Sequence, residues 1–191
     1  MPLAAPWVSG CTSQDRATIT ITTGGETDTF TQIPAPTALQ VAAVQSDGDG
    51  GEKTTILADA TLPATSVDLG SLDESASAVI TVTGFDSNSH AILSGQSLDL
   101  DFSNLPGSNV PVFVQRKGQF ARLPNPLTDT RTSPLLAILQ GEYLLVTGGD
   151  DVDAGATTSL YDFLGLSPTT GPQNIYRAAQ SIAIDGAVAW L

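Results

Sequence analysis

The stretch LLAILQGEYLLVTGGDDVDAGATTSLYD, residues 135–162, decides the fold class of this chain. Its three short apolar runs lie at 135–139, 143–147 and 158–161. A turn containing Gly141 separates the first two runs, and the pair Gly148-Gly149 follows the second. Short runs divided by glycine turns are typical of antiparallel strands. We therefore expect an antiparallel sheet, with the glycine pair at positive φ, where glycine carries no steric cost.

The same pattern begins again near the end of the sequence. Residues 181–191, SIAIDGAVAWL, copy the strand–turn–strand pattern that starts at Leu136. Gly186 takes the place of Gly141, about 45 residues further on, and this spacing lies in the range of propeller blades. The sequence thus predicts a repeat region over 135–191.

This region resembles a Kelch repeat. The residues that carry the resemblance are Leu144-Leu145-Val146, the pair Gly148-Gly149 and the downstream pair Tyr161-Asp162. A tryptophan that such repeats carry about six residues after the tyrosine is missing, since 166–168 read Leu-Ser-Pro. The resemblance implies one β-propeller blade and the start of another. Propellers close with at least about four blades, so it also implies a fragment of a longer protein. The competing interpretation is a plain hairpin within one β domain.

Composition limits the remaining classes. The chain has 191 residues, 41% hydrophobic and 14% charged, which is enough for one or two domains with a core. It is rich in Thr, Ser, Val and Gly, which favours strands over helices. A net charge of −13 argues against nucleic acid as a partner. No apolar run reaches the roughly 18 residues of a membrane helix.

Residues 1–16 are predicted to be a truncated signal and tether. The apolar lead ending in Val8-Ser9-Gly10-Cys11 resembles a bacterial lipobox. That resemblance implies that Cys11, the only cysteine, is lipidated and becomes the mature N-terminus. The lead is shorter than a usual signal peptide and has no basic segment. An exposed thiol near an unstructured terminus is the alternative.

Residues 17–117 are predicted to form a β-sandwich. Strand-like segments recur every 8–15 residues or so, as in sandwiches. They lie at 18–22, 39–44, 56–62, 67–69, 78–83, 92–93, 97–102 and 110–114. Pro111 indicates an edge position for the last, because proline has no N–H. The block resembles the immunoglobulin-like or transthyretin-like sandwiches of bacterial surface lipoproteins. A proline-containing linker, 118–134, joins it to the repeat region.

The alternation of polar and apolar residues is strictest in residues 97–102, SLDLDF. It predicts Leu98, Leu100 and Phe102 facing inward and Asp99 and Asp101 facing solvent.

Candidate chemistry is sparse. The single histidine, His90, lies in a Ser/Asn/Asp loop and is expected at a solvated hairpin tip. A triad with Asp86 and either Ser87 or Ser97 can be drawn, but no Gly-x-Ser-x-Gly elbow accompanies it. One histidine and one cysteine argue against a zinc site.

Two acidic, glycine-containing loops are candidate calcium sites. Their carboxylates are those of Asp47, Asp49, Asp151 and Asp153. Oxygen ligands suit calcium, but the closing glutamate of an EF-hand loop is missing. The competing interpretation is a turn that uses aspartate and glycine for backbone reasons. Five aromatic residues are candidates for either core packing or a sugar platform: Trp7, Tyr143, Tyr161, Tyr176 and Trp190.

Taken together, the sequence predicts an all-β, non-catalytic binding or scaffolding module of a bacterial cell-envelope lipoprotein. The expected ligand is protein or carbohydrate, with no nucleic acid, no required cofactor, and membrane contact only through the lipid anchor. One alternative is part of a propeller enzyme of the galactose-oxidase type, whose copper ligands would lie in other blades. Another is a spacer that lifts a propeller off the membrane.

Overall fold

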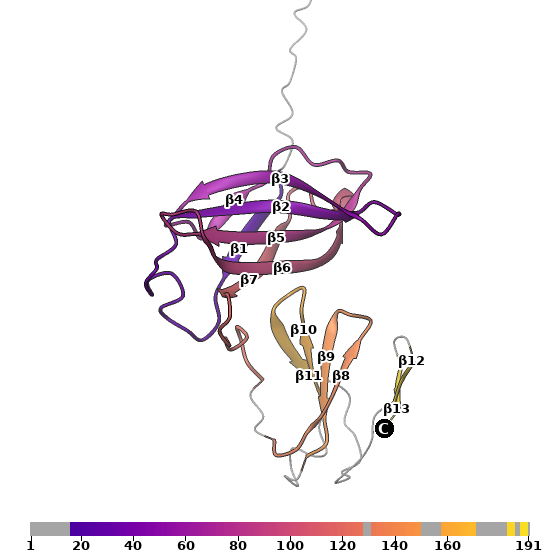
Figure 1. The fold of residues 1–191 in the computed structure, drawn as a ribbon. Coiled ribbons are helices and arrows are strands. Elements are labelled where there is room, and N and C mark those ends of the chain that lie inside the picture. Colours follow the sequence, from indigo (N-terminus) through magenta and orange to yellow (C-terminus); the bar gives the residue numbers. More distant parts are fainter. Residues whose placement is uncertain (1–15, 128–130, 150–157, 171–182, 186–187, 191) are drawn as a thin grey trace, which may run out of the picture.

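The chain is all-β in the computed structural model (Figure 1). The structure describes residues 16–127, 131–149, 158–170, 183–185 and 188–190. In these segments the one helix is a single 3-10 turn, η1 (Phe102–Asn104). No helix in this part of the chain is long and apolar enough to cross a bilayer. The prediction of an all-β protein is therefore confirmed.

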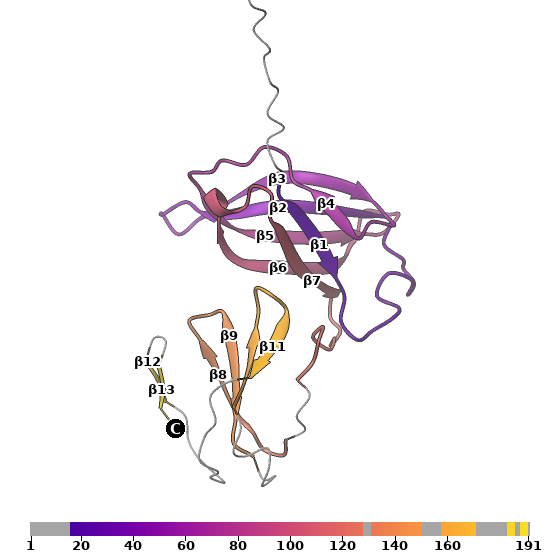
Figure 2. The same cartoon turned by 180° about the vertical axis from the view of Figure 1, so that it is seen from behind.

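Seven strands form one continuous sheet in the order β3-β2-β5-β6-β7-β1-β4. Their bounds are β1 (Thr18–Thr22), β2 (Ala38–Ser46), β3 (Glu52–Thr61), β4 (Ser66–Asp68), β5 (Ser77–Phe85), β6 (Ala91–Asp101) and β7 (Asn109–Arg116). The sheet curls into a half-barrel, which Figures 1 and 2 show from opposite sides. β1 runs parallel to β7, whereas the other pairings are antiparallel.

Alternation along these strands explains the curl and the core. In β5 every second residue is buried, so one face points inward and the other outward. Inward side chains from opposite halves of the sheet meet in one apolar core. Its most buried members are Ile19, Leu39, Val41, Leu69, Ile80, Val82, Leu93, Val112 and Val114. Each such side chain contributes about 1.5–3 kcal/mol of transfer free energy, which offsets the entropy of ordering the strands.

Several strand predictions needed correction. β6 does not break at Gly95 but continues from Ala91 to Asp101. β7 is not an edge strand, because it lies between β6 and β1. At Pro111 itself the pairing is to Thr20 of β1, and the pairing to β6 begins three residues later. The missing N–H of Pro111 is tolerated because its β6 side makes no ladder there.

A second sheet contains β8 (Leu135–Leu139), β9 (Tyr143–Thr147), β10 (Thr158–Asp162) and β11 (Ser167–Thr170) in the order β11-β10-β9-β8. All its pairings are antiparallel, as predicted. The β8–β9 turn has positive φ at Gln140 and Gly141. Glu142 N donates to Leu139 O at 3.0 Å, closing a type I′ turn. The glycine pair has the expected positive φ, 65° at Gly148 and 118° at Gly149.

The predicted copy of the first hairpin is a separate two-stranded sheet. β12 (Ala183–Asp185) pairs antiparallel with β13 (Val188–Trp190). This pairing matches the strand–turn–strand pattern that the sequence repeats.

Residues before β8 pack onto the second sheet. The buried Tyr161 hydroxyl donates to Pro124 O at 2.6 Å, and Asn125 Nδ2 donates to Leu166 O at 3.1 Å. Arg131 Nη1 donates to Gly148 O at 3.1 Å. These bonds hold Pro124, Asn125 and Arg131 against the second sheet.

Candidate functional site: an uncharged cleft

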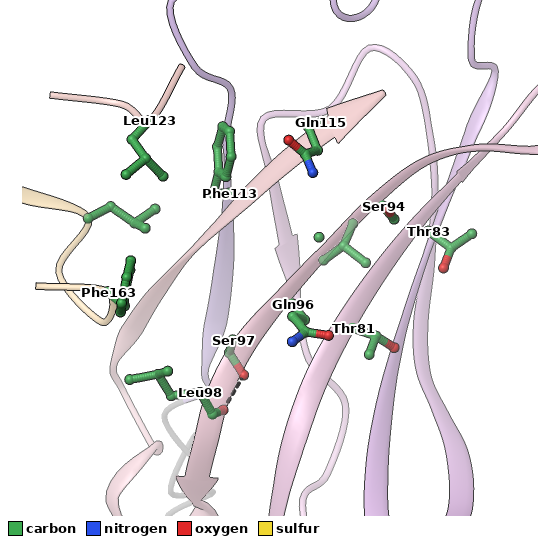
Figure 3. A pocket seen from close by; sticks show the side chains of 13 residues that line it. Thr81, Thr83, Ser94, Gln96, Ser97, Leu98, Phe113, Gln115, Leu123 and Phe163 are labelled. Carbon is green, nitrogen blue, oxygen red and sulfur yellow. Dashed lines mark hydrogen bonds between the residues drawn. The ribbon is translucent and has the colours of Figure 1, made fainter. Parts of the chain in front are cut away.

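A cleft of about 640 Å³ lies between the outer face of the half-barrel and the β10–β11 end of the second sheet (Figure 3). Its floor is built from outward-facing residues of β5, β6 and β7. Register places Thr83 beside Ser94 and Ser94 beside Gln115, which makes one row across three strands. Thr81 and Gln96 form a second row. Neighbouring residues on one strand face are about 7 Å apart, so the two rows lie that far from each other.

Gly95 allows the floor to form. A Cβ at this position would lie 2.3 Å from the Phe113 carbonyl oxygen. Only glycine therefore lets β6 approach β7 this closely. Phe113, half-buried on β7, lines the cleft beside this crossing.

A bulge at Ser97 shapes the end of the floor. The register between β5 and β6 shifts between Val79 and Thr81. Ser97 Oγ accepts from Ile80 N at 2.9 Å and donates to Leu98 O at 2.6 Å. The hydroxyl thus replaces a ladder carbonyl where the bulge interrupts the pairing. Because of this shift Leu98 is only half-buried, whereas Leu100 and Phe102 are buried and Asp99 and Asp101 exposed, as predicted.

The opposite wall is apolar and consists of Leu123, Phe163 and Leu166. Phe163 N donates to Glu142 O at 2.9 Å, so the two turns of the second sheet are tied together. The Phe163 ring packs at a tilt on Tyr161, with centroids 5.9 Å apart. Leu166 is buried and adopts φ 49°, a left-handed conformation that the Asn125 bond to its carbonyl supports.

The described residues that line the cleft carry no charged side chain. The polar ones are amides and hydroxyls, from Thr81, Thr83, Ser94, Gln96, Ser97 and Gln115. Each of these groups can both donate and accept a hydrogen bond. Two phenylalanine rings, Phe113 and Phe163, add apolar surface. In a chain of net charge −13, a neutral cleft of this kind fits an uncharged polar ligand better than an ion.

No protein-family model, curated protein or solved structure matches the chain. The cleft is therefore interpreted from its own geometry.

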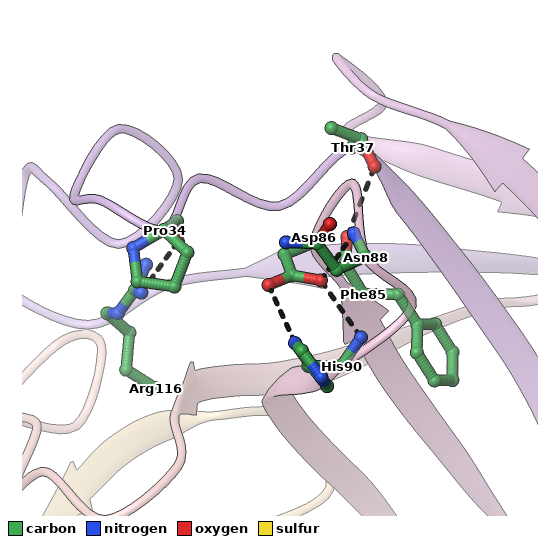
Figure 4. Close-up of polar contacts among 7 residues, drawn as sticks. All are labelled: Pro34, Thr37, Phe85, Asp86, Asn88, His90 and Arg116. Carbon is green, nitrogen blue, oxygen red and sulfur yellow. Dashed lines mark hydrogen bonds and ion pairs between the residues drawn. The ribbon is translucent and has the colours of Figure 1, made fainter.

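His90 and Asp86 form a turn at the end of the β5–β6 hairpin (Figure 4). Asp86 Oδ1 accepts from Asn88 N at 2.8 Å and from His90 N at 2.9 Å. Its Oδ2 lies 3.3 Å from His90 Nδ1. The His90 backbone amide, followed by the Asn88 amide, holds the pKa of the Asp86 carboxyl below its usual value.

The triad that would use Ser97 is not assembled. Ser97 lies seven residues along β6 from His90, roughly 20 Å away for an extended strand. Ser97 Oγ is already used in the bulge. The His90 side chain is 75% exposed, as expected for a hairpin tip.

Arg116 organises the neighbouring loop (Figure 4). It is buried, and its guanidinium donates to three backbone carbonyls, those of Thr29, Gln32 and Pro34. A planar guanidinium presents five donors in fixed directions, so it can gather several carbonyls at once. Arg116 therefore positions the β1–β2 loop.

The two candidate calcium loops have different outcomes. Asp47 Oδ1 accepts from Asp49 N at 3.1 Å and Gly51 N at 2.8 Å, so this carboxylate shapes the β2–β3 turn. The described residues contain no group of three or more His, Cys, Asp or Glu side chains arranged to hold a metal. Asp151 and Asp153 lie outside the described residues, as does Cys11.

Of the four repeat-motif residues, Tyr161 and Asp162 lie in β10 of the second sheet, and Gly148 and Gly149 directly follow β9. A Cβ on Gly149 would lie 3.0 Å from Thr132 O. Tyr161 is 1% exposed, and its neighbour Asp162 accepts from Leu164 N at 2.7 Å through Oδ1. Burial of the Tyr161 ring raises the pKa of its hydroxyl. Tyr161 is therefore a core-packing residue of the second sheet. Of the other aromatic candidates, Trp7 and Tyr176 lie outside the described residues.

The cleft residues Gln96, Gln115 and Phe163 carry no local sequence signal. They are outward-facing positions of ordinary strands or part of a turn. Only the packing of residues 163–166 against β5–β7 brings them together. The alternating pattern of β5 could have identified Thr81 and Thr83 as its outward-facing polar residues. It could not have identified the apolar wall that faces them.

Proposed function

We propose that the chain is a non-catalytic binding module of a bacterial cell-envelope lipoprotein, and that the cleft is its ligand site. One observation carries this proposal: the cleft is lined by amides, hydroxyls and two phenylalanine rings, which bind ligands but do not transfer protons near neutral pH. Its volume lies in the range of about 300–1,000 Å³ typical of ligand pockets.

Filling the cleft tests the binding function. Ser94→Trp places a large ring in the middle of the floor, whereas Ser66→Trp places the same ring on exposed β4. A panel of oligosaccharides and peptides is screened by NMR against both variants and the parent chain. Ligands should bind the parent and the Ser66 variant and fail with the Ser94 variant. Equal binding by all three would place the ligand site outside the cleft. Binding by none of them would favour the spacer role, in which the half-barrel only supports other domains.

We further propose that β8–β11 is a Kelch-like propeller blade and that the half-barrel is a variant of the immunoglobulin-like sandwich. Support for the blade comes from its four antiparallel strands in sequential order, which is how blades are built. Both of its faces also carry apolar side chains. Leu136, Ile138, Leu144 and Val146 share one face by register, and Ala137 and Leu145 share the other. A sheet that is apolar on both faces is suited to lie between two layers.

The envelope location rests on Cys11 and is tested by mass spectrometry. The reading frame, with its upstream codons, is expressed in a bacterium supplied with an alkyne-tagged fatty acid. The mature chain should begin at Cys11 and carry the tag. Cys11→Ser should abolish tagging, and Ser13→Ala should preserve it. A Cys11→Ser chain that stays tagged would refute the anchor without touching the binding function.

A further inference from the structure

We propose that the cleft binds a neutral oligosaccharide. This inference rests on the proposed binding function and names its ligand class. It goes beyond the cleft's shape, because it depends on how the polar and aromatic residues are arranged around it.

The floor offers a dense set of paired hydrogen-bonding groups. The row Thr83–Ser94–Gln115 crosses three strands at about 4.8 Å per strand. Thr81 and Gln96 form a second, shorter row across β5 and β6, about 7 Å along the strands. Sugar hydroxyls both donate and accept, and so do amides and hydroxyls. A chain of sugar rings lying across the strands can therefore satisfy both rows.

The aromatic rings supply the other half of sugar recognition. Phe113 stands on the floor and Phe163 on the opposite wall (Figure 3). Sugar rings have an apolar face of C–H groups that can pack on an aromatic face, whose electron density is negative. Phe163 is held by its backbone bond to Glu142 and its ring contact with Tyr161. It is therefore fixed before a ligand arrives.

A polypeptide fits this cleft less well. β5 pairs with β2 and β6 on its two sides, and β6 pairs with β7 at Leu93, Ser94 and Gly95, so the floor at Thr83 and Ser94 presents side chains and not a free backbone edge. The described residues that line the cleft also include no Tyr, Trp or Arg, the side chains that dominate protein interfaces. An anionic polymer is disfavoured by the net charge of −13.

NMR titration of the ¹⁵N-labelled full chain tests this proposal. The neutral probes are maltohexaose, cellohexaose and chitohexaose. An anionic galacturonate hexamer and a casein-derived peptide mixture are the comparison probes. At least one neutral hexasaccharide should shift the side-chain amide signals of Gln96 and Gln115. The galacturonate hexamer should not shift them.

Matched variants locate the site. Gln96→Ala and Gln115→Ala should each weaken binding about threefold to tenfold, the value of one hydrogen bond. Phe163→Leu keeps the bulk of the wall but removes the ring, and should also weaken binding. Gln45→Ala removes the same amide from β2, away from the cleft, and should leave the affinity unchanged.

Three outcomes would overturn the proposal. Oligosaccharide binding that is unchanged in Gln96→Ala and Gln115→Ala would place the sugar elsewhere. Peptides that shift the cleft amides where no sugar does would refute the ligand class but leave the binding function standing. No shift with any probe would refute both.

Discussion

At the scale of single residues, Gly95 controls both the fold and the cleft. A Cβ on Gly95 would meet a backbone oxygen, which cannot move aside as a flexible side chain could. Gly95→Ala should lower the free energy of unfolding by about 1–3 kcal/mol, the usual cost of overpacking. Urea denaturation measures the change.

Gly70 provides the matched control for that substitution. A Cβ there would lie 3.6 Å from Leu57 O, an ordinary contact. Gly70→Ala should change the stability by no more than about 0.5 kcal/mol. Equal losses for both glycines would contradict the close approach of β6 and β7.

Asp86 should make stability depend on acid pH. Its pKa is lowered in the folded chain, first by the His90 backbone amide, so the folded state prefers the carboxylate. The resulting stabilisation is complete above the unfolded pKa of about 3.9 and is lost as pH falls toward the lower folded pKa. Denaturation between about pH 2 and 6 should show less loss of stability for Asp86→Asn than for the parent.

The variant His90→Ala separates the contribution of the His90 backbone amide to the lowered pKa of Asp86 from the contribution of the imidazole ring. It removes the imidazole but keeps the amide that donates to Asp86. Most of the acid dependence should therefore survive in this variant. If it vanished as fully as in Asp86→Asn, the ring and not the turn would be responsible.

At the scale of elements, the β8–β9 turn is open to improvement. Gln140 occupies a left-handed position that asparagine adopts at lower cost. Gln140→Asn should stabilise the second sheet by about 0.5–1 kcal/mol. Hydrogen exchange of the β8 and β9 amides measures this locally.

Glu142, in the same turn, has no positive φ and serves as the control. Glu142→Asn should bring no gain in protection. A gain of equal size would mean that the turn type is not what limits the hairpin.

Strands with strict alternation can be predicted from the sequence, and those without it cannot. β1 and β5 show the pattern clearly, and the sequence predicts both near their observed bounds. β3 begins at Glu52, earlier than expected, because its first residues are exposed and polar on an edge strand and carry no burial pattern. In the sequence, Gly95 suggests that the strand ends there. Glycine is in fact required at this position by the close approach of β7, a contact that the local sequence does not reveal. The cleft depends on the same kind of distant packing, so its residues cannot be named from the sequence.

At the scale of the whole molecule, the second sheet exposes apolar surface. Leu136 and Ile138 are 58% and 56% exposed on one face of β8. Replacing both with threonine keeps β-propensity and removes this surface. The double variant should bind less of the dye ANS, with stability changed by no more than about 0.5 kcal/mol.

Leu145, on the buried side of the same sheet, is the control. Leu145→Thr should cost about 2–5 kcal/mol, since it removes packed apolar volume. Unchanged ANS fluorescence in the double variant would show that another surface binds the dye.

The parallel pairing of β1 with β7 affects how the chain folds during its synthesis. Thr18 pairs with Asn109 and Thr22 with Phe113, so the first strand is joined along its whole length by the last strand of the half-barrel. Contacts this distant in sequence slow folding, because a long loop must close before they form. On a ribosome, β1 emerges first and must wait until β7 is released. Until then the edge of β1 that faces β7 stays unpaired, although β4 can already pair with the other edge, and an unpaired strand edge is a place where a chaperone can protect a nascent chain.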